Sequence, residues 1–431
     1  DQLLPIENLK RGFVFAGGLS MAMLLWLGWY LTRVPDPAQW RSDAVPWLST
    51  PDGFRISYLG NPMAADRKKG RARNVWDLQR FDQRLFLGGG DTMVNGGTVN
   101  VWAFDPAESR FIREFHVDEE AIEVFRVLEN RLFIPASDPR NRDESKFYHR
   151  PRRTGGTETP AWTAVYDPLP LAHVRDLAFF HNRLIGVGNS RTPPTMGGAF
   201  VSRDFGKSLR LAVPEDPTTP YKWADHWHFS VFEYEDILFS PTIRLSPVAD
   251  LPSIATYDLD KEAFAVNSDF STSDFLPVTR KGEPRRFTLR LWLPISFHGH
   301  LIYPAKTYAI SEEFYNRSYG CFTKKGLREK AVETSFPHPG VVGEDVVVEV
   351  GVMYALTNLP EMNRSHRIAV YAAQPPSEGE LEWELVFEFT ATNKGRSFEK
   401  MGADFYIGLG HEHDEPTNHS GALLKVSQWP E

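Results

Sequence analysis

The amino-acid sequence predicts an all-β fold, a seven-bladed β-propeller, preceded by one N-terminal transmembrane α-helix. Two observations predict the propeller: a hairpin pattern occurs seven times at a blade-sized spacing, and the strand missing from the last copy is found before the first. A third observation, a stretch of 21 residues without charge, predicts the helix. The predicted segments are a tail at 1–11, the helix at 12–32, a linker at 33–48 and the propeller at 49–431.

The hairpin pattern is clearest between Val174 and Gly188. Two apolar stretches rich in strand-forming residues flank His181 and Asn182. A two-residue connection that contains Asn is typical of a tight antiparallel turn with positive φ. This segment therefore predicts a β-hairpin.

The same pattern recurs along the whole chain. Its second strand contains one equivalent apolar residue in each copy, and successive copies lie 47, 52, 54, 63, 52 and 52 residues apart. This period fits a four-stranded blade with long loops. A β-sandwich or several small β domains would also contain many short strands, but the near-constant period favours the propeller. The seven equivalent residues are Leu85, Leu132, Leu184, Leu238, Leu301, Met353 and Phe405.

The two ends of the chain predict how the ring closes. Only 26 residues follow Phe405, which leaves room for one further strand at 422–427, so the last blade lacks its outer strand. Residues 54–59 alternate apolar and polar side chains, as a half-buried strand does. We expect this strand to pair with 422–427 and to point Phe54, Ile56 and Tyr58 into the packing of the seventh blade.

Composition limits the classes of partner. The chain has 431 residues and a formal net charge of −8 at pH 7, which argues against a nucleic-acid partner because that binding needs a basic face. Its single cysteine, Cys321, excludes an internal disulfide framework and a cysteine-based zinc site.

Residues 12–32 are long enough to cross a hydrocarbon core of about 30 Å as a helix. Trp26 and Trp29 stand where an interfacial aromatic belt is expected. A cleaved signal peptide is the alternative, but the small-residue cleavage site typical of one is absent after the apolar stretch. Basic residues flank the segment almost equally on both sides, so the short tail decides the orientation: it stays in the cytoplasm, and the propeller lies on the extracytoplasmic (periplasmic) side.

Small residues in the predicted helix indicate how it could bind partners. Gly17, Gly18 and Ser20 would allow close packing against the helices of other membrane protein subunits, with Trp26 and Trp29 near the lipid interface. The expected partners are thus other membrane subunits and the lipid bilayer.

The most specific motif follows the strand at 198–201. It reads Ser202-Arg-Asp204-Phe-Gly206-Lys-Ser208-Leu209 and resembles an Asp-box, the Ser-x-Asp-x-Gly-x-Thr-Trp turn of sialidase-like propellers, with Leu209 in place of the aromatic residue. The resemblance implies a structural turn built by Ser202, Asp204 and Gly206. Propellers with this turn include sialidases, sortilin-type receptors and the propeller assembly factor of photosystem II, so the resemblance implies either an enzyme or a protein-binding scaffold.

Candidate catalytic residues come from two positions that should line the channel on the innermost strands. Mixed carboxylates and arginines there could support glycoside hydrolysis, with Asp176, Asp345, Glu123 and Arg175 as the candidates. Sialidases, however, use three arginines and a Tyr-Glu pair, and only Arg175 and Arg396 fall near the mouth. We therefore expect a channel lined by solvated polar groups. The residues eight before each repeat position are Asp77, Val124, Asp176, Ser230, Leu293, Asp345 and Ser397; those nine before are Trp76, Glu123, Arg175, Phe229, Trp292, Glu344 and Arg396.

One histidine-rich stretch could bind a metal ion. His411, His413 and Asp414 combine imidazole and carboxylate ligands at strand-like spacing. Neighbouring glycines and a proline place them in a loop, where charged residues are common. We expect neither a metal nor another cofactor.

The leading interpretation is a non-enzymatic, membrane-tethered propeller that acts as a scaffold or accessory subunit of a larger membrane complex. The Asp-box resemblance makes a photosynthetic or other energy-transducing complex one possibility. The alternative interpretation is a membrane-anchored, sialidase-like glycan hydrolase or lectin.

Overall fold

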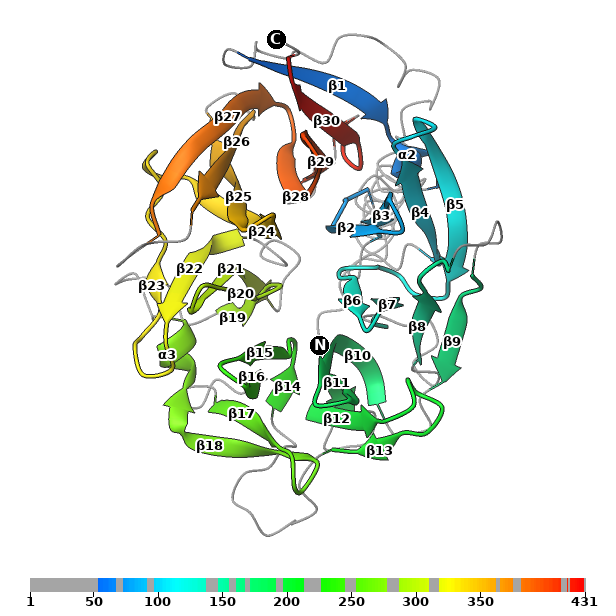
Figure 1. The fold of residues 1–431 in the computed structure, drawn as a ribbon, viewed down its shortest axis with the longest axis vertical. Helices are drawn as coiled ribbons and strands as arrows, with labels where there is room; N and C mark the ends of the chain where they lie inside the picture. Colours follow the sequence, from blue (N-terminus) through cyan, green and yellow to red (C-terminus); the bar gives the residue numbers. More distant parts are fainter. Residues whose placement is uncertain are drawn as a thin grey trace, which may run out of the picture.

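The structure of the protein is a computed structural model in which the described residues form seven antiparallel β-sheets around a central axis (Figure 1). Each sheet has four strands, or five where the innermost strand is in two pieces. The predicted all-β, seven-bladed propeller is confirmed. The described residues are 53–66, 73–90, 97–136, 146–154, 160–166, 171–190, 197–212, 226–244, 253–276, 287–309, 318–361, 365–374, 381–411, 417 and 419–429.

The first three blades have four strands each, ordered outward from the axis. Blade 1 consists of β2 (Asp77–Phe81), β3 (Arg84–Gly88), β4 (Val99–Asp105) and β5 (Arg110–Val117). Blade 2 consists of β6 (Arg126–Leu128), β7 (Arg131–Ile134), β8 (Lys146–Pro151) and β9 (Thr163–Tyr166). Blade 3 consists of β10 (Leu171–Phe180), β11 (Arg183–Ser190), β12 (Gly197–Ser202) and β13 (Arg210–Leu211).

Blades 4 and 5 have a divided innermost strand. Blade 4 consists of β14 (His226–His228), β15 (Phe232–Tyr234), β16 (Ile237–Arg244), β17 (Ser253–Asp258) and β18 (Ala263–Ser271). Blade 5 consists of β19 (Phe287–Leu291), β20 (Ile295–Phe297), β21 (His300–Ala309), β22 (Ser318–Lys325) and β23 (Val332–Glu333), and the short helix α3 (Thr272–Phe275) lies between the two blades in the chain.

The last two blades again have four strands. Blade 6 consists of β24 (Val342–Glu349), β25 (Val352–Pro360), β26 (His366–Ala373) and β27 (Trp383–Ala391). Blade 7 consists of β28 (Lys394–Met401), β29 (Asp404–Gly410), β30 (Leu423–Gln428) and β1 (Phe54–Gly60), and α2 (Pro62–Asp66) follows β1.

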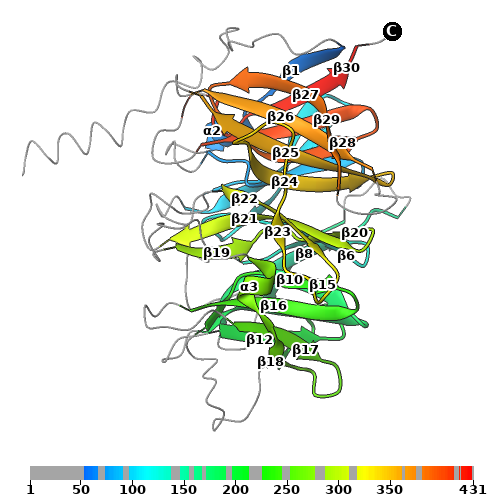
Figure 2. The ribbon, with the colours of Figure 1, turned by 90° about the vertical axis from the view of Figure 1, so that its left-hand side faces the viewer.

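In every blade a hairpin turn joins the innermost strand to the next strand outward. These turns lie on one face of the ring, which we call the hairpin face. This face is turned to the viewer in Figure 1 and lies to the right in Figure 2. In blade 3, φ is 45° at His181 and 59° at Asn182, so the predicted tight turn with positive φ is confirmed. Such a turn follows the right-handed twist of the two strands that it joins.

The ring is closed by a strand from the beginning of the chain. β1 pairs antiparallel with β30, with Phe54 opposite Gln428 and Ile56 opposite Val426. Phe54 and Ile56 pack against the apolar core between blades 6 and 7. The expectation that Tyr58 also points into this core is wrong: Tyr58 is exposed, and its ring lies edge-on to that of His419.

The predicted transmembrane helix at 12–32 lies outside the described residues, as do Gly17, Gly18, Ser20 and both tryptophans of the predicted aromatic belt. Within the part of the chain that is described, none of the helices has the length and apolar character needed to span a bilayer.

Candidate functional site

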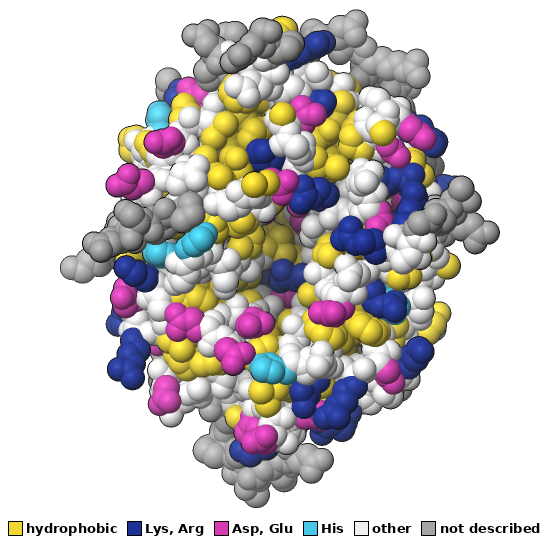
Figure 3. Space-filling view, in the orientation of Figure 1, with side chains coloured by type: hydrophobic (Ala, Val, Ile, Leu, Met, Phe, Trp, Pro, Cys, Tyr) yellow, Lys and Arg dark blue, Asp and Glu magenta, His cyan; other side chains and the backbone are white. Residues whose placement is uncertain are grey.

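A cavity of about 800 Å³ opens on the hairpin face at the axis of the ring. It is lined by the innermost strands of blades 1, 2, 5, 6 and 7, and Asp77, Asp345 and Glu399 are among its walls. Figure 3 looks onto this face and shows basic side chains around the central hollow. The volume of the cavity suits a small organic molecule.

Three aspartates join neighbouring blades at equivalent positions. Asp77 accepts a hydrogen bond from the backbone N–H of Phe125 at 2.6 Å, and Asp345 accepts one from Phe398 at 3.0 Å. Asp176 accepts the equivalent bond from Val231 at 2.9 Å. Each carboxyl thus reaches the innermost strand of the next blade, and we call this contact the inter-blade latch.

Asp176 makes the most complete latch. Its two carboxylate oxygens also accept hydrogen bonds from Arg126 Nε at 2.8 Å and Nη2 at 2.7 Å. The backbone N–H of Leu177 donates another at 2.9 Å. A bidentate arginine pair is geometrically specific, so this predicted candidate connects blades 2, 3 and 4.

Glu123 and Arg175 lie deeper than the sequence suggested. Both are buried: Glu123 lies 3.4 Å from Arg290 Nη1, and the Arg175 guanidinium lies 5.2 Å from the centre of the Phe229 ring. The expectation of solvated polar groups is wrong at this level of the channel. Glu123 forms an ion pair with a residue of blade 5, and Arg175 stacks on an aromatic ring of the next blade.

Three carboxyls facing the cavity have raised pKa values. Burial, and then the nearby Asp345 carboxyl, raises the pKa of Asp77 to about 8. Burial also raises the pKa of Asp345 to about 7 and that of Glu399 to about 8. Acids of this kind in a cavity are candidates for proton transfer or hydrogen-bond donation at neutral pH.

Lys306 is a buried charged side chain near the axis. It projects from β21 and is 0% exposed, with Nζ 4.2 Å from the centre of the Trp292 ring. Its amine has no hydrogen-bond partner among the described residues. Burial lowers the pKa of Lys306 to about 7, and the nearby Glu344 carboxylate opposes that shift.

Strand β28 carries two further cations, Lys394 and Arg396, that lie close to Lys306. Lys394 forms an ion pair with Glu344, and the Arg396 guanidinium lies 4.0 Å from the centre of the Trp76 ring. We call the five residues around this point the axial cluster: Lys306, Glu344, Asp345, Lys394 and Arg396.

Sequence reasoning found Asp345 and Arg396 but missed Lys306 and Glu399. Glu399 lies two positions after Ser397 on the same strand, so strand alternation places it on the same side of β28. Lys306 interrupts the otherwise largely apolar strand β21, and this interruption was the available signal.

The histidine-rich stretch is described only at His411. The His411 side chain is buried, with Nε2 3.2 Å from Asn74 Nδ2. His413 and Asp414 lie outside the described residues. Among the residues that are described, no three His, Cys, Asp or Glu side chains are grouped so as to hold a metal ion.

The Asp-box-like turn is held by its own side chains. Ser202 Oγ accepts a hydrogen bond from the N–H of Gly206 at 2.7 Å, and Asp204 Oδ1 accepts one from the N–H of Ser208 at 2.9 Å. Gly206 has φ 95°, and a Cβ there would lie 2.8 Å from Phe147. These contacts give Ser202, Asp204 and Gly206 a local structural role.

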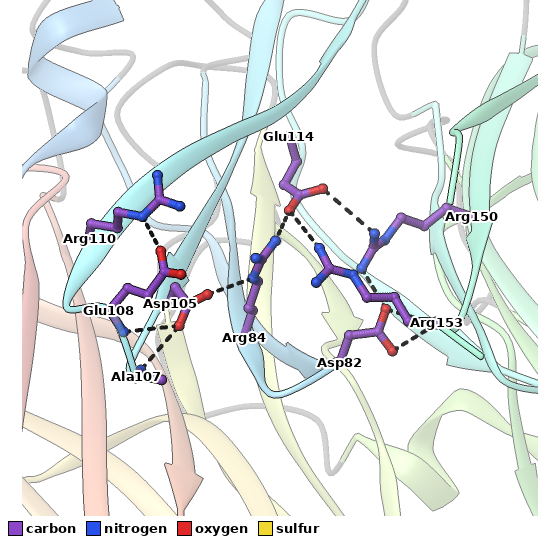
Figure 4. A network of polar contacts seen from close by, with 9 residues as sticks. All are labelled: Asp82, Arg84, Asp105, Ala107, Glu108, Arg110, Glu114, Arg150 and Arg153. Carbon is purple, nitrogen blue, oxygen red and sulfur yellow. Dashed lines mark hydrogen bonds and ion pairs between the residues drawn. The ribbon is translucent and has the colours of Figure 1, made fainter. Parts of the chain in front are cut away.

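A second buried polar network lies between blades 1 and 2, away from the axis (Figure 4). Glu114 forms an ion pair with Arg84 and lies 3.6 Å from Arg150 and 3.9 Å from Arg153. Asp82 accepts a hydrogen bond from Arg150 at 2.8 Å. We call these five residues the peripheral network.

The fold and the channel define a closed seven-bladed β-propeller. No protein-family model matches the chain, and no curated protein matches it. Among solved structures, the Cps50 (Swd1) β-propeller domain of Myceliophteria thermophila is similar with 11% identity and a TM-score of 0.42, covering 84% of this chain and 98% of that one. The polysaccharide lyase Uly1 is similar with 9% identity and a TM-score of 0.45, covering 91% and 95%. A putative 6-phosphogluconolactonase from Bacteroides uniformis is similar with 12% identity and a TM-score of 0.41, covering 75% and 89%.

Proposed function

We propose that this protein is a non-enzymatic, membrane-tethered β-propeller that acts as a scaffold or accessory subunit of a larger membrane complex. The observation that carries the proposal is that charged residues near the axis contact other blades. Asp176, Glu123 and Arg175 are engaged in contacts with neighbouring strands and rings. Together with the closing strand β1, these contacts favour a rigid ring that presents its loops to a partner.

The anchor in this proposal is the uncharged segment at 12–32. Gly17, Gly18 and Ser20 would pack against helices of other membrane subunits, while Trp26 and Trp29 contact the bilayer interface. The propeller would lie on the extracytoplasmic, periplasmic side. The Asp-box-like turn adds photosynthetic and other energy-transducing complexes as candidate partners.

Extraction of the full chain in a mild detergent tests this proposal. A partner that co-purifies in constant ratio through size exclusion would support it, and mass spectrometry would identify that partner. Gly17→Leu with Gly18→Leu should release the partner but leave the chain in the membrane fraction, with Ser42→Leu in the linker as the control. A solitary chain in the wild-type extract would contradict the scaffold role.

A membrane-anchored glycan hydrolase or lectin is the second candidate. Its specific support is the cavity, where Asp345 lies with two other carboxyls of raised pKa. Glycan-array binding and a hydrolysis screen test it, with Asp345→Asn and Asp77→Asn as the variants. Wild-type activity in both variants would remove these two carboxyls from the proposal.

A further inference from the structure

Two of the three latch aspartates lack the cation that the third one has. Asp176 accepts two hydrogen bonds from the Arg126 guanidinium, at 2.8 Å and 2.7 Å, in addition to its bonds from the backbone. Asp77 and Asp345 occupy the equivalent positions on β2 and β24, and among the described residues only backbone N–H groups donate hydrogen bonds to them. Within the described part of the chain, the same carboxyl position therefore has a cationic partner in blade 3 and none in blades 1 and 6.

A third acid of this kind lies in the same cavity. Glu399 is 8% exposed and lines the cavity together with Asp77 and Asp345. Its carboxyl is contacted by the backbone N–H of Arg80, whose guanidinium donates two hydrogen bonds of 2.8 Å to Glu349. A carboxylate can accept about four hydrogen bonds, so all three acids have acceptor capacity left.

The other charged side chains that line the cavity have contacts of their own. Arg126 is held in the latch of blade 3, and Asp82 accepts a hydrogen bond from Arg150 at 2.8 Å. The exposed Arg152 has its guanidinium 4.7 Å from the centre of the Phe81 ring. A ligand that brings a cation into the cavity would pair with the three remaining acids as Arg126 pairs with its latch carboxylate.

Another part of the cavity wall favours a ligand with an apolar body. Leu293, Ile295 and Val347 line this part. Leu293 stands at the latch position of blade 5, where φ is 45°. Positive φ is uncommon for a residue with a Cβ, and strained backbone of this kind is concentrated at functional sites. The cavity thus combines acidic groups with aliphatic surface.

We propose that this cavity binds a primary alkylammonium ion, whose ammonium group donates hydrogen bonds to Asp77, Asp345 and Glu399 and whose alkyl chain contacts the aliphatic side chains of blades 5 and 6. An ammonium group has three N–H donors, one for each acid. A metal ion fits less well, because among the described residues no three such ligands are grouped so as to hold one. This binding activity is separate from the scaffold role and does not depend on it.

The affinity for such a cation should rise with pH. Burial raises the pKa of Asp77 and of Glu399 to about 8 and that of Asp345 to about 7. An acid pairs with the cation after losing its proton, so binding releases protons and strengthens as pH rises through about 7 to 8. The other charged groups around the three acids are Arg80, Asp82, Arg126, Arg152, Lys306, Glu344 and Glu349, of which Arg80, Arg126 and Lys306 favour the ionised acids.

Calorimetric titration of the full chain in detergent with butylammonium tests the proposal, with the detergent solution alone as the blank. Butylammonium keeps its proton over the range used, and 1-butanol and butyrate are neutral and anionic analogues of similar size. We expect butylammonium to bind at least about tenfold more tightly at about pH 8 than at about pH 6. At the higher pH it should also bind at least about tenfold more tightly than either analogue. Titrations in two buffers with different ionisation enthalpies should show that binding releases protons.

Two variants and a control assign the binding to these acids. Glu399→Gln keeps the size of a side chain that is not part of a latch, and it should weaken butylammonium binding about tenfold because a charge-assisted hydrogen bond is lost. Asp77→Asn should have the same effect and serves as the second variant. Asp236→Asn is the control, since the Asp236 side chain is 79% exposed in the hairpin turn of blade 4. No butylammonium binding above the blank, equal binding of 1-butanol, affinity that falls with rising pH, or wild-type affinity in both acid variants would overturn the proposal.

Discussion

The peripheral network and the axial cluster both bury charged side chains between blades, but only in the peripheral network does every cation lie within ion-pair distance of a carboxylate. In the peripheral network, Arg150 is 0% exposed and contacts both Asp82 and Glu114 (Figure 4). In the axial cluster, Lys306 is buried to the same degree, yet its amine has no hydrogen-bond partner among the described residues. An ion pair offsets part of the cost of burying a charge, whereas an amine without an acceptor leaves that cost in place.

This difference teaches how two kinds of buried charge can be told apart. Where each charge has its partner, as at Glu114, removal of one partner should cost stability because a charge is left uncompensated. Where the partner is missing, removal of the charge should cost little or improve stability. A buried charge without a partner is therefore a candidate functional group.

The largest expected effect is in the peripheral network. Glu114→Gln should lower the free energy of unfolding by about 3 kcal/mol or more, because Arg84 and Arg150 lose their buried carboxylate. Chemical denaturation at neutral pH measures it. Glu108→Gln on the exposed side of the same region is the control, and equal midpoints for both variants would contradict the structural role of Glu114.

The pH dependence of stability is the next largest effect. Asp77, Asp345 and Glu399 have folded-state pKa values of about 8, 7 and 8, above the values near 4 expected for the unfolded chain. Between about pH 4 and pH 7 the folded state therefore holds more protons than the unfolded chain, so the free energy of unfolding should fall as pH rises through this range. The lowered pKa of Lys306 acts with the opposite sign only above about pH 7.

Thermal midpoints between pH 5 and pH 8 measure this slope. Asp345→Asn should flatten it, while Asp236→Asn, an exposed control, should leave it unchanged. A wild-type midpoint that rises steadily with pH would show that these carboxyls are ionised in the folded state.

Lys306→Met gives the sharpest contrast with Glu114→Gln. This variant should be as stable as the wild type or more stable by about 1 kcal/mol, because it removes a buried charge that lacks a hydrogen-bond acceptor. Chemical denaturation at neutral pH measures the change in the free energy of unfolding. A loss as large as that of Glu114→Gln would mean that Lys306 is a structural ion-pair member.

The smallest effect is expected at a partly exposed cluster of three arginines, Arg183, Arg203 and Arg210, around Glu262. Arg183 and Arg203 both contact its carboxylate, and their hydrogen bonds lower the pKa of Glu262 to about 2. Solvent screens these contacts, so Glu262→Gln should change the free energy of unfolding by less than about 1 kcal/mol at neutral pH. A change comparable to that of Glu114→Gln would remove the distinction between buried and exposed networks.

Much of the architecture was predictable because its signals are local in the chain. The turn at His181 and Asn182 and the alternation of residues 54–59 each follow from backbone and side-chain preferences within a few residues. The latch aspartates Asp176 and Asp345 were also found, since each repeat places the same position on its innermost strand. Their role was not, because it depends on an amide of the next blade.

The sequence by itself determined the number of blades, the position of the inner hairpins and the pairing that closes the ring. These features follow from the spacing of apolar residues and from the turn residues, which are local properties of the chain. Only the tertiary structure decided which charges are paired. Lys306 and Glu399 lie far apart in sequence from the groups that shift their pKa values, Glu344 and Asp345 for Lys306 and Arg80 for Glu399. Burial and charge pairing depend on how the blades pack, so the buried Arg150 contacts two carboxylates whereas the amine of the buried Lys306 has no hydrogen-bond partner among the described residues.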